Sequence, residues 1–130
     1  MSEAIGLVLC DDLIFASRIT GTARSLGLDA KAARTIDALQ KVLQDCTPRC
    51  LIVDLANPTL KLPELMTFLR EHCTAMPRVV AFGSHVDTAS LAAARAAGCD
   101  PVLPRSKFVD ELPTALASWC TAGDQRLSPS

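Results

Sequence analysis

Aromatic residues are scarce in this chain of 130 residues, which has four Phe, one Trp and no Tyr. Neither sign of charge is in excess, because 13 basic and 14 acidic residues give a formal net charge of −1. The excess of positive charge that would indicate binding to nucleic acid or an anionic membrane is therefore absent, and neither partner is expected. No apolar run approaches the roughly 18 residues that a membrane span requires, so no membrane association is expected.

Signals for export and for nucleotide binding are also missing. Residues 1–12 contain no basic leader and no cleavage site, and two acids soon end their apolar run. A secretory signal would have both features, so a cytoplasmic protein is expected. Neither G-x-G-x-x-G nor a P-loop occurs, which argues against a nucleotide-binding enzyme.

Cysteine, by contrast, is frequent, and its six copies need an interpretation. In a small secreted chain an even number of cysteines would suggest disulfides. Here several lie within apolar segments, where a free cysteine behaves as a small hydrophobic residue. Cys46 and Cys50 form a C-x3-C spacing, but no second Cys or His pair accompanies them, as a zinc site would need. Reduced structural thiols are the favoured interpretation, with a metal or redox role as the alternative.

Short apolar runs alternate along the chain with segments in which apolar residues recur every three or four positions. The strand-like runs cover residues 5–10, 28–33, 50–54, 78–82 and 100–104. The segments between and after them have the periodicity of helices packed on one face. Gly27 and Gly98 stand where two of these helices should end, and Pro113 is expected to mark an early turn or break in the last.

Five such strand–helix units predict an α/β fold: a doubly wound, five-stranded parallel sheet with helices on both faces. The length favours a single domain, which we place at residues 1–122. Residues 123–130 lack apolar content and are expected to form a disordered tail.

Three acids stand at the predicted carboxyl ends of strands, where ligands bind in sheets of this kind. Asp11 and Asp12 follow the first strand, and Asp54 ends the third. If these strands are neighbours, the carboxylates converge, and a cation such as Mg²⁺ would offset their repulsion. A carboxylate beside Mg²⁺ can attack phosphorus. Plainer interpretations stay open: helix capping for Asp11 and Asp12, and the start of a loop for Asp54.

Further motifs surround these acids: Asp54 follows the apolar run LIV, Pro58 stands four residues after it, and AAARAAGCDPVLPR covers residues 92–105. In this combination, residues 5–119 resemble the receiver domain of bacterial response regulators, which has a CheY-like (flavodoxin-like) fold. The resemblance implies that Asp54 accepts a phosphoryl group from a histidine kinase. It also implies that Mg²⁺ is bound by Asp11, Asp12, Asp54 and the backbone carbonyl of Ala56.

The chain departs from the receiver pattern at two positions that the family uses at the phosphorylation site. Where receivers have a Thr or Ser at the end of the fourth strand, this chain has Gly83, and Ser84 is either a substitute or a capping or loop residue. Where receivers have Lys followed by a cis-proline, it has Arg105 and Ser106. Arg105 retains a positive charge that can contact a phosphate. No cis bond is expected there, since a non-proline cis peptide costs about 2.5–4 kcal/mol.

A third departure is Val102, which replaces the aromatic residue that reorients in many receivers. Lys107 is a second candidate cation, although a surface lysine is the plainer interpretation, and His85 either lines the cleft or lies on the surface. The acids are thus retained, while the residues that convert phosphorylation into movement are altered.

These departures favour a stand-alone atypical receiver, or pseudo-receiver, that acts in signal transduction by protein–protein contact. The alternative is a phospho-accepting response regulator switched by phosphorylation of Asp54 with Mg²⁺. A histidine kinase or another signalling protein is the expected partner, and a homodimer is compatible with the sequence. A hydrolase or small-ligand protein on the same fold is a weaker hypothesis, because acids following Cys10 would repel phosphate, so no enzyme is expected. By family resemblance the interaction face would include Ala92, Arg95, Ala96, Val102 and Lys107.

Overall fold

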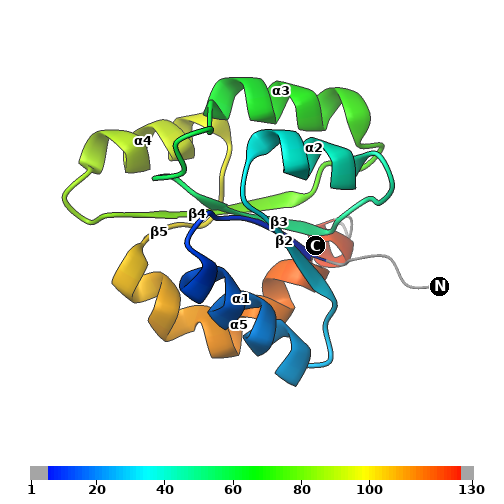
Figure 1. Ribbon diagram of the computed structural model, residues 1–130, viewed down its shortest axis with the longest axis horizontal. Helices are drawn as coiled ribbons and strands as arrows, with labels where there is room; N and C mark the ends of the chain where they lie inside the picture. The colour runs from blue at the N-terminus through cyan, green and yellow to red at the C-terminus, as the bar shows by residue number, and fades with distance from the viewer. Residues whose placement is uncertain (1–5, 127–130) are drawn as a thin grey trace.

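Strands and helices alternate along the chain in the computed structural model, which describes the backbone of residues 6–126 and the side chains of residues 6–120. Figure 1 shows the elements as one sheet between two layers of helices. The strands are β1 (Gly6–Leu9), β2 (Ala30–Ala33), β3 (Cys50–Asp54), β4 (Arg78–Gly83) and β5 (Val102–Pro104). The helices are α1 (Leu13–Ser25), α2 (Ile36–Leu43), α3 (Leu62–His72), α4 (Thr88–Ala97) and α5 (Arg105–Arg126).

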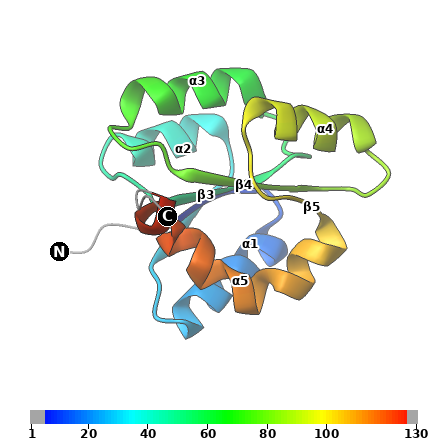
Figure 2. The same ribbon diagram turned by 180° about the vertical axis from the view of Figure 1, so that it is seen from behind.

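The five strands form one parallel sheet in the order β2-β1-β3-β4-β5. The strand order reverses between β1 and β3, which are neighbours in register from Gly6 beside Cys50 to Leu9 beside Val53. Helices α2, α3 and α4 cover one face of the sheet, and α1 and α5 cover the other (Figures 1 and 2). The predicted doubly wound α/β fold is therefore confirmed, and it brings the ends of β1 and β3 together.

Two hydrophobic cores lie on the two faces of the sheet, because successive strand side chains point to opposite faces. The core under α2, α3 and α4 is mainly aliphatic, with Leu51 and Val53 of β3 at its centre. The core under α1 and α5 receives Ile52 from the same strand and contains most of the aromatic residues. Strands buried on both faces explain why β3 is continuously apolar until its last residue.

Several helix ends follow the sequence signals. Gly27 and Gly98 have φ angles of +77° and +104°, which a residue with a side chain rarely adopts, and they follow α1 and α4 as predicted. Thr35 caps α2 by accepting the N–H of Ala38, and Asp87 caps α4 by accepting the N–H of Ser90. Within residues 6–126, no helix is both long and apolar enough to cross a membrane.

Helix α5 differs from prediction in two respects. Pro113 lies inside the helix and does not mark a turn or break. A proline there removes one backbone donor, but Phe108 and Leu116 are both buried, so packing on either side of Pro113 holds the helix together. The helix also continues through residues 123–126, which the sequence analysis assigned to the tail. Residues 127–130 lie outside the described part of the chain.

Candidate functional site

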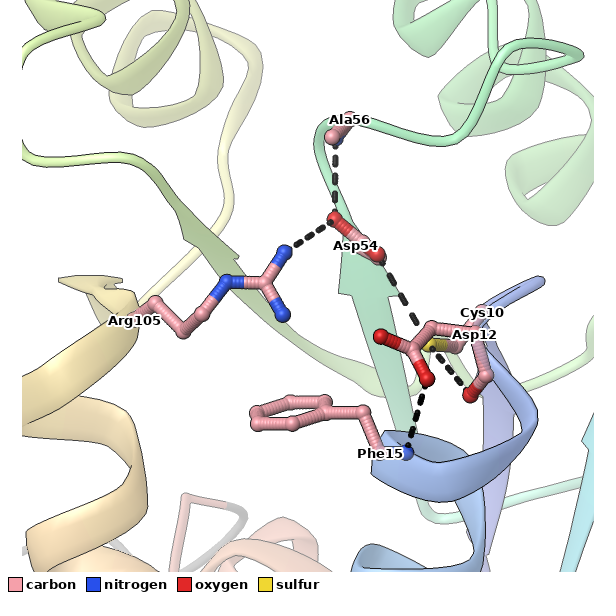
Figure 3. A network of polar contacts seen from close by, with 6 residues as sticks. All are labelled: Cys10, Asp12, Phe15, Asp54, Ala56 and Arg105. Atoms are coloured by element: carbon pink, nitrogen blue, oxygen red, sulfur yellow. Dashed lines mark hydrogen bonds and ion pairs between the residues drawn. The ribbon is translucent and has the colours of Figure 1, made fainter.

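Asp54 is the last residue of β3 and is 3% exposed, although it carries a carboxylate. Its Oδ1 accepts the N–H of Ala56 at 2.9 Å, so the loop after the strand folds back onto the side chain (Figure 3). Burying a carboxylate is costly unless it is hydrogen-bonded or paired with a charge. The surroundings of Asp54 therefore have to supply further partners.

Arg105 is the principal charge partner of Asp54. It begins α5, and its Nη2 atom lies 3.7 Å from Asp54 Oδ1 (Figure 3). The guanidinium also lies over the rings of Phe15, at 4.8 Å from the centroid, and Phe82, at 5.3 Å. Cation–π contacts of this kind hold a guanidinium in place while leaving part of it in water, and the Arg105 side chain is 40% exposed. The structure thus brings together the two predicted residues Asp54 and Arg105.

Cys10 is a member of the site that the sequence did not indicate. Its thiol donates to Asp54 Oδ2 and to the carbonyl of Asp12, both at 3.6 Å. Burial, together with a smaller contribution from the nearby Asp54, raises the pKa of Cys10 to about 11. The thiol is therefore neutral and can serve as a weak donor to the carboxylate. Only its position directly before the acid pair would have suggested this role.

The acid pair divides into one structural and one exposed residue. Asp12 Oδ1 accepts the N–H groups of Ile14 and Phe15, each at 3.1 Å, and so caps α1. Asp11 is exposed and has no hydrogen bond or ion pair to any residue that the structure describes. The helix-capping interpretation therefore holds for Asp12.

The predicted Mg²⁺ ligands match the ion in kind but do not form an assembled site. Carboxylate and carbonyl oxygens are the ligands that Mg²⁺ takes. Among the described residues, the Cys10 thiol is the only donor to Asp54 Oδ2. Across the described residues, however, no three His, Cys, Asp or Glu side chains are grouped so that they could hold a metal. Arg105 already places a positive charge beside Asp54.

The position at which receivers carry the hydroxyl lies against apolar side chains. A Cβ atom built on Gly83 would lie 3.3 Å from Leu55 Cδ1 and 3.6 Å from Leu91 Cδ2. The neighbouring Ser84 is exposed, and its Oγ accepts the N–H of Val86 at 3.3 Å within its own loop. Geometry thus favours the loop interpretation of Ser84, and neither residue brings a hydroxyl to Asp54.

The other candidates lie further out. Lys107 is 61% exposed and pairs with Glu111 at 3.7 Å, as a surface lysine would. His85 lines an open hollow of about 500 Å³ between the loop after β4 and the start of α5. The hollow is lined by Ser84, His85, Arg105, Ser106, Val109 and Asp110. The peptide between Arg105 and Ser106 is not cis, as expected; a cis bond occurs instead at Asp100–Pro101.

Asn57 is the second buried polar residue among those that the structure describes, at 4% exposure. Its Nδ2 donates to the carbonyl of Arg34 at 2.9 Å. Its Oδ1 accepts the N–H of Thr59 at 3.0 Å and the hydroxyl of Thr59 at 2.6 Å. Both ends of the amide are therefore satisfied, by Thr59 in the loop between β3 and α3 and by Arg34 just before α2.

No protein-family model and no curated protein matches this sequence. Solved structures do. NtrX from Brucella abortus superimposes with a TM-score of 0.80 and 16% identity over 96% of this chain, which spans 28% of NtrX. The receiver domain of Francisella response regulator 1452 gives a TM-score of 0.74 and 20% identity over 90% of this chain and 96% of that one.

A CheY-like response regulator receiver domain protein from Methanospirillum hungatei gives a TM-score of 0.79 and 13% identity, over 96% of this chain and 99% of that chain. The superpositions extend over nearly the whole described chain at low sequence identity. The chain therefore has the receiver-domain fold that the motifs around Asp54 predicted.

Proposed function

We propose that this domain acts in two-component signal transduction as an atypical receiver that binds a partner protein by contact and does not require phosphorylation of Asp54. The observation that carries the proposal is the absence of a hydroxyl at the end of β4. Leu55 occupies the space beside Gly83, and Ser84 uses its hydroxyl inside its own loop. A phosphoryl group on Asp54 would have no hydroxyl at the end of β4 to attract. It would therefore not draw the loop after β4 towards Asp54.

Arg105 gives the same proposal a second support. Its positive charge lies beside a buried carboxylate, and the Phe15 and Phe82 rings hold it there. A resident cation lowers the need for Mg²⁺ at a cluster of acids. Asp54 can therefore stay buried in a domain that is never phosphorylated.

The second candidate is a phospho-accepting response regulator, and Asp54 Oδ2 is the atom that favours it. Among the described residues, that oxygen accepts a hydrogen bond only from the Cys10 thiol, so it is available to attack phosphorus. In that step a bond forms from Oδ2 to phosphorus, and the bond from phosphorus to the donor's leaving atom breaks with its electron pair leaving on the donor. Asp11, Asp12, Asp54 and the carbonyl of Ala56 would hold Mg²⁺, which would neutralise the phosphoryl oxygens.

The partner follows from either candidate. A histidine kinase or another signalling protein fits a receiver fold. We assign the domain no catalytic activity. We place it in the cytoplasm. The exposed face of α4 includes Ala92, Arg95 and Ala96. Its alanine side chains are small, so a helix of a partner or of a second copy can approach closely.

The test is intact mass after incubation with Mg²⁺ and acetyl phosphate. We expect no phosphoryl adduct on the natural sequence, while the double variant Gly83→Thr, Arg105→Lys should gain one, because it restores the two receiver residues. Asp54→Asn in each background is the matched control. An adduct on the natural sequence that Asp54→Asn removes would overturn the proposal in favour of the phospho-accepting regulator.

A further inference from the structure

Loop residues 55–61, between β3 and α3, are hydrogen-bonded at one end to Asp54 and at the other to the start of α2. Asp54 Oδ1 accepts the N–H of Ala56 at 2.9 Å, and the Asp54 carbonyl accepts the N–H of Asn57 at 3.0 Å. The Asp54 carboxylate therefore helps to determine where Asn57 lies.

Asn57 links this loop to the start of α2 by hydrogen bonds. Its Nδ2 donates to the carbonyl of Arg34, and its Oδ1 accepts the Thr59 hydroxyl at 2.6 Å. The same hydroxyl oxygen accepts the N–H of Ile36 at 3.0 Å, which is the first residue of α2. Each bond is short and within normal hydrogen-bond geometry, so the chain of contacts from Asp54 to α2 is continuous.

Burial makes the central link of this chain costly to break. Asn57 and Asp54 are the two buried polar residues among those described. A buried amide that loses its partners is penalised, because its donor and acceptor are then left unsatisfied away from water. A displacement of the loop at Asp54 would therefore also displace Asn57 and the residues to which Asn57 is bonded.

We propose that Asn57 is a positioning residue, through which the Asp54 carboxylate holds the first turn of α2 in place. The first turn of α2 borders an open hollow of about 360 Å³ between α2 and the start of α3, so its position determines the shape of this hollow. Thr35, Ile36 and Thr59, which belong to the hydrogen-bonded chain or cap α2, all line it. This deepens the proposed function, because it gives a reason for a contact-driven receiver to retain an aspartate that it does not phosphorylate.

The test measures hydrogen exchange at the Ala38 amide by NMR, since that N–H is bonded to Thr35 Oγ1 and to none of the altered residues. Asp54→Ala, which removes the acceptor for Ala56, should speed this exchange about tenfold. Asp54→Asn retains an acceptor oxygen and should speed it less. No phosphorylation is involved, so failure here is distinguishable from failure of the proposed function.

The decisive comparison repeats Asp54→Ala in two backgrounds altered at Thr59, an exposed residue whose replacement leaves the core intact. In Thr59→Ser, which retains the hydroxyl, the tenfold effect of Asp54→Ala should persist. In Thr59→Val, which lacks the hydroxyl, Asp54→Ala should change Ala38 exchange less than about twofold. An equal effect of Asp54→Ala in both backgrounds, or no effect in the natural one, would overturn the inference.

The control lies on the other side of the site. Asp87→Ala removes the cap of α4, a comparable loss at a distance from Asn57. It should leave Ala38 exchange unchanged. A change at Ala38 as large as that of Asp54→Ala would mean that exchange reports general loosening, and it would also overturn the inference.

Discussion

The two sides of Asp54 differ in the kind of contact that they make. Towards α2, Asp54 continues into hydrogen bonds of 2.6–3.0 Å through Ala56, Asn57 and Thr59. Towards α5, it meets an ion pair at 3.7 Å whose guanidinium rests on aromatic rings. Figure 3 shows Ala56 and Arg105 approaching the same carboxylate oxygen from different elements.

This difference shows that separate elements fix the position of the loop after β3 and supply the positive charge beside Asp54. Hydrogen bonds are directional and weaken steeply as their geometry worsens, so the α2 side determines where the loop lies. A half-exposed ion pair tolerates movement and is partly screened by water, so the α5 side supplies charge without fixing the loop. The following variants should break or sharpen this contrast.

The largest effect is expected in the aromatic core that supports Arg105. Phe108 is fully buried and stacks on Phe82 at 4.5 Å and on Trp119 at 5.7 Å. Phe108→Ala should lower the free energy of unfolding by about 3–5 kcal/mol, because it leaves a cavity. Urea denaturation measures this, with Leu39→Ala, which empties a buried site on the α2 side, as the comparison. A smaller loss for Phe108→Ala than for Leu39→Ala would contradict the importance of the aromatic core.

On the α2 side the corresponding variant is Asn57→Ala. It removes the bonds to Arg34 and Thr59 and leaves the Arg34 carbonyl without this donor. A loss of about 2 kcal/mol in unfolding free energy is expected. Thr59→Ser, which retains the hydroxyl, should lie within about 0.5 kcal/mol of the natural sequence. A loss below that of the control would mean that water replaces Asn57 without penalty.

The fold could be predicted because apolar periodicity reports burial directly. Residues 50–54 form a continuous apolar run ending in an acid, and that is sufficient to place Asp54 at the carboxyl edge of a parallel sheet. The same reasoning placed Arg105 at this edge of the sheet, since it stands where β5 ends; its contact with Asp54 came from the structure. Residues at strand ends are positioned by the sheet itself, and the sheet was predictable.

Asn57 and Cys10 could not be predicted, for a different reason. Their roles depend on loop conformation and on hydrogen bonds between segments far apart in sequence, such as Asn57 to Arg34. No periodicity encodes such contacts. Pro113 was misjudged because local propensity was given more weight than the burial of the helix face on both sides of it.

Removing Arg105 should change the charge beside Asp54 without changing the position of the loop after β3. Arg105→Ala is expected to cost about 1 kcal/mol in unfolding free energy, since the pair is long and half-exposed. It should also raise the affinity for Mg²⁺ at least about threefold, because the acids lose their resident cation. Calorimetric titration with Mg²⁺ measures this, and Lys107→Ala, which removes a surface cation paired with Glu111, is the control. Equal Mg²⁺ affinity in both variants would show that Arg105 does not compete with the metal.

A smaller effect is expected from a side chain at Gly83. A Cβ there meets Leu55 Cδ1 at 3.3 Å, so Leu55 must move by a few tenths of an ångström. Gly83→Ala should therefore destabilise by about 0.5–1 kcal/mol in urea denaturation. Combining it with Leu55→Ala, which clears the space, should remove this penalty. If Gly83→Ala raises the free energy of unfolding, the space beside Gly83 is open and Leu55 does not restrict it.

The smallest effect concerns the α4 cap, which among the described residues forms no hydrogen bond with Asp54. Hydrogen bonds from the Ser90 hydroxyl and N–H lower the pKa of Asp87 below its ordinary value of 3.8. A lowered folded pKa contributes stability that is present above the ordinary pKa and is lost as pH falls through the folded one. Melting temperatures of Asp87→Asn and the natural sequence should therefore differ more at about pH 6 than at about pH 3. Asp11→Asn, at an exposed carboxylate without a cap role, is the control, and an equal pH trend in both variants would remove Asp87 as the source.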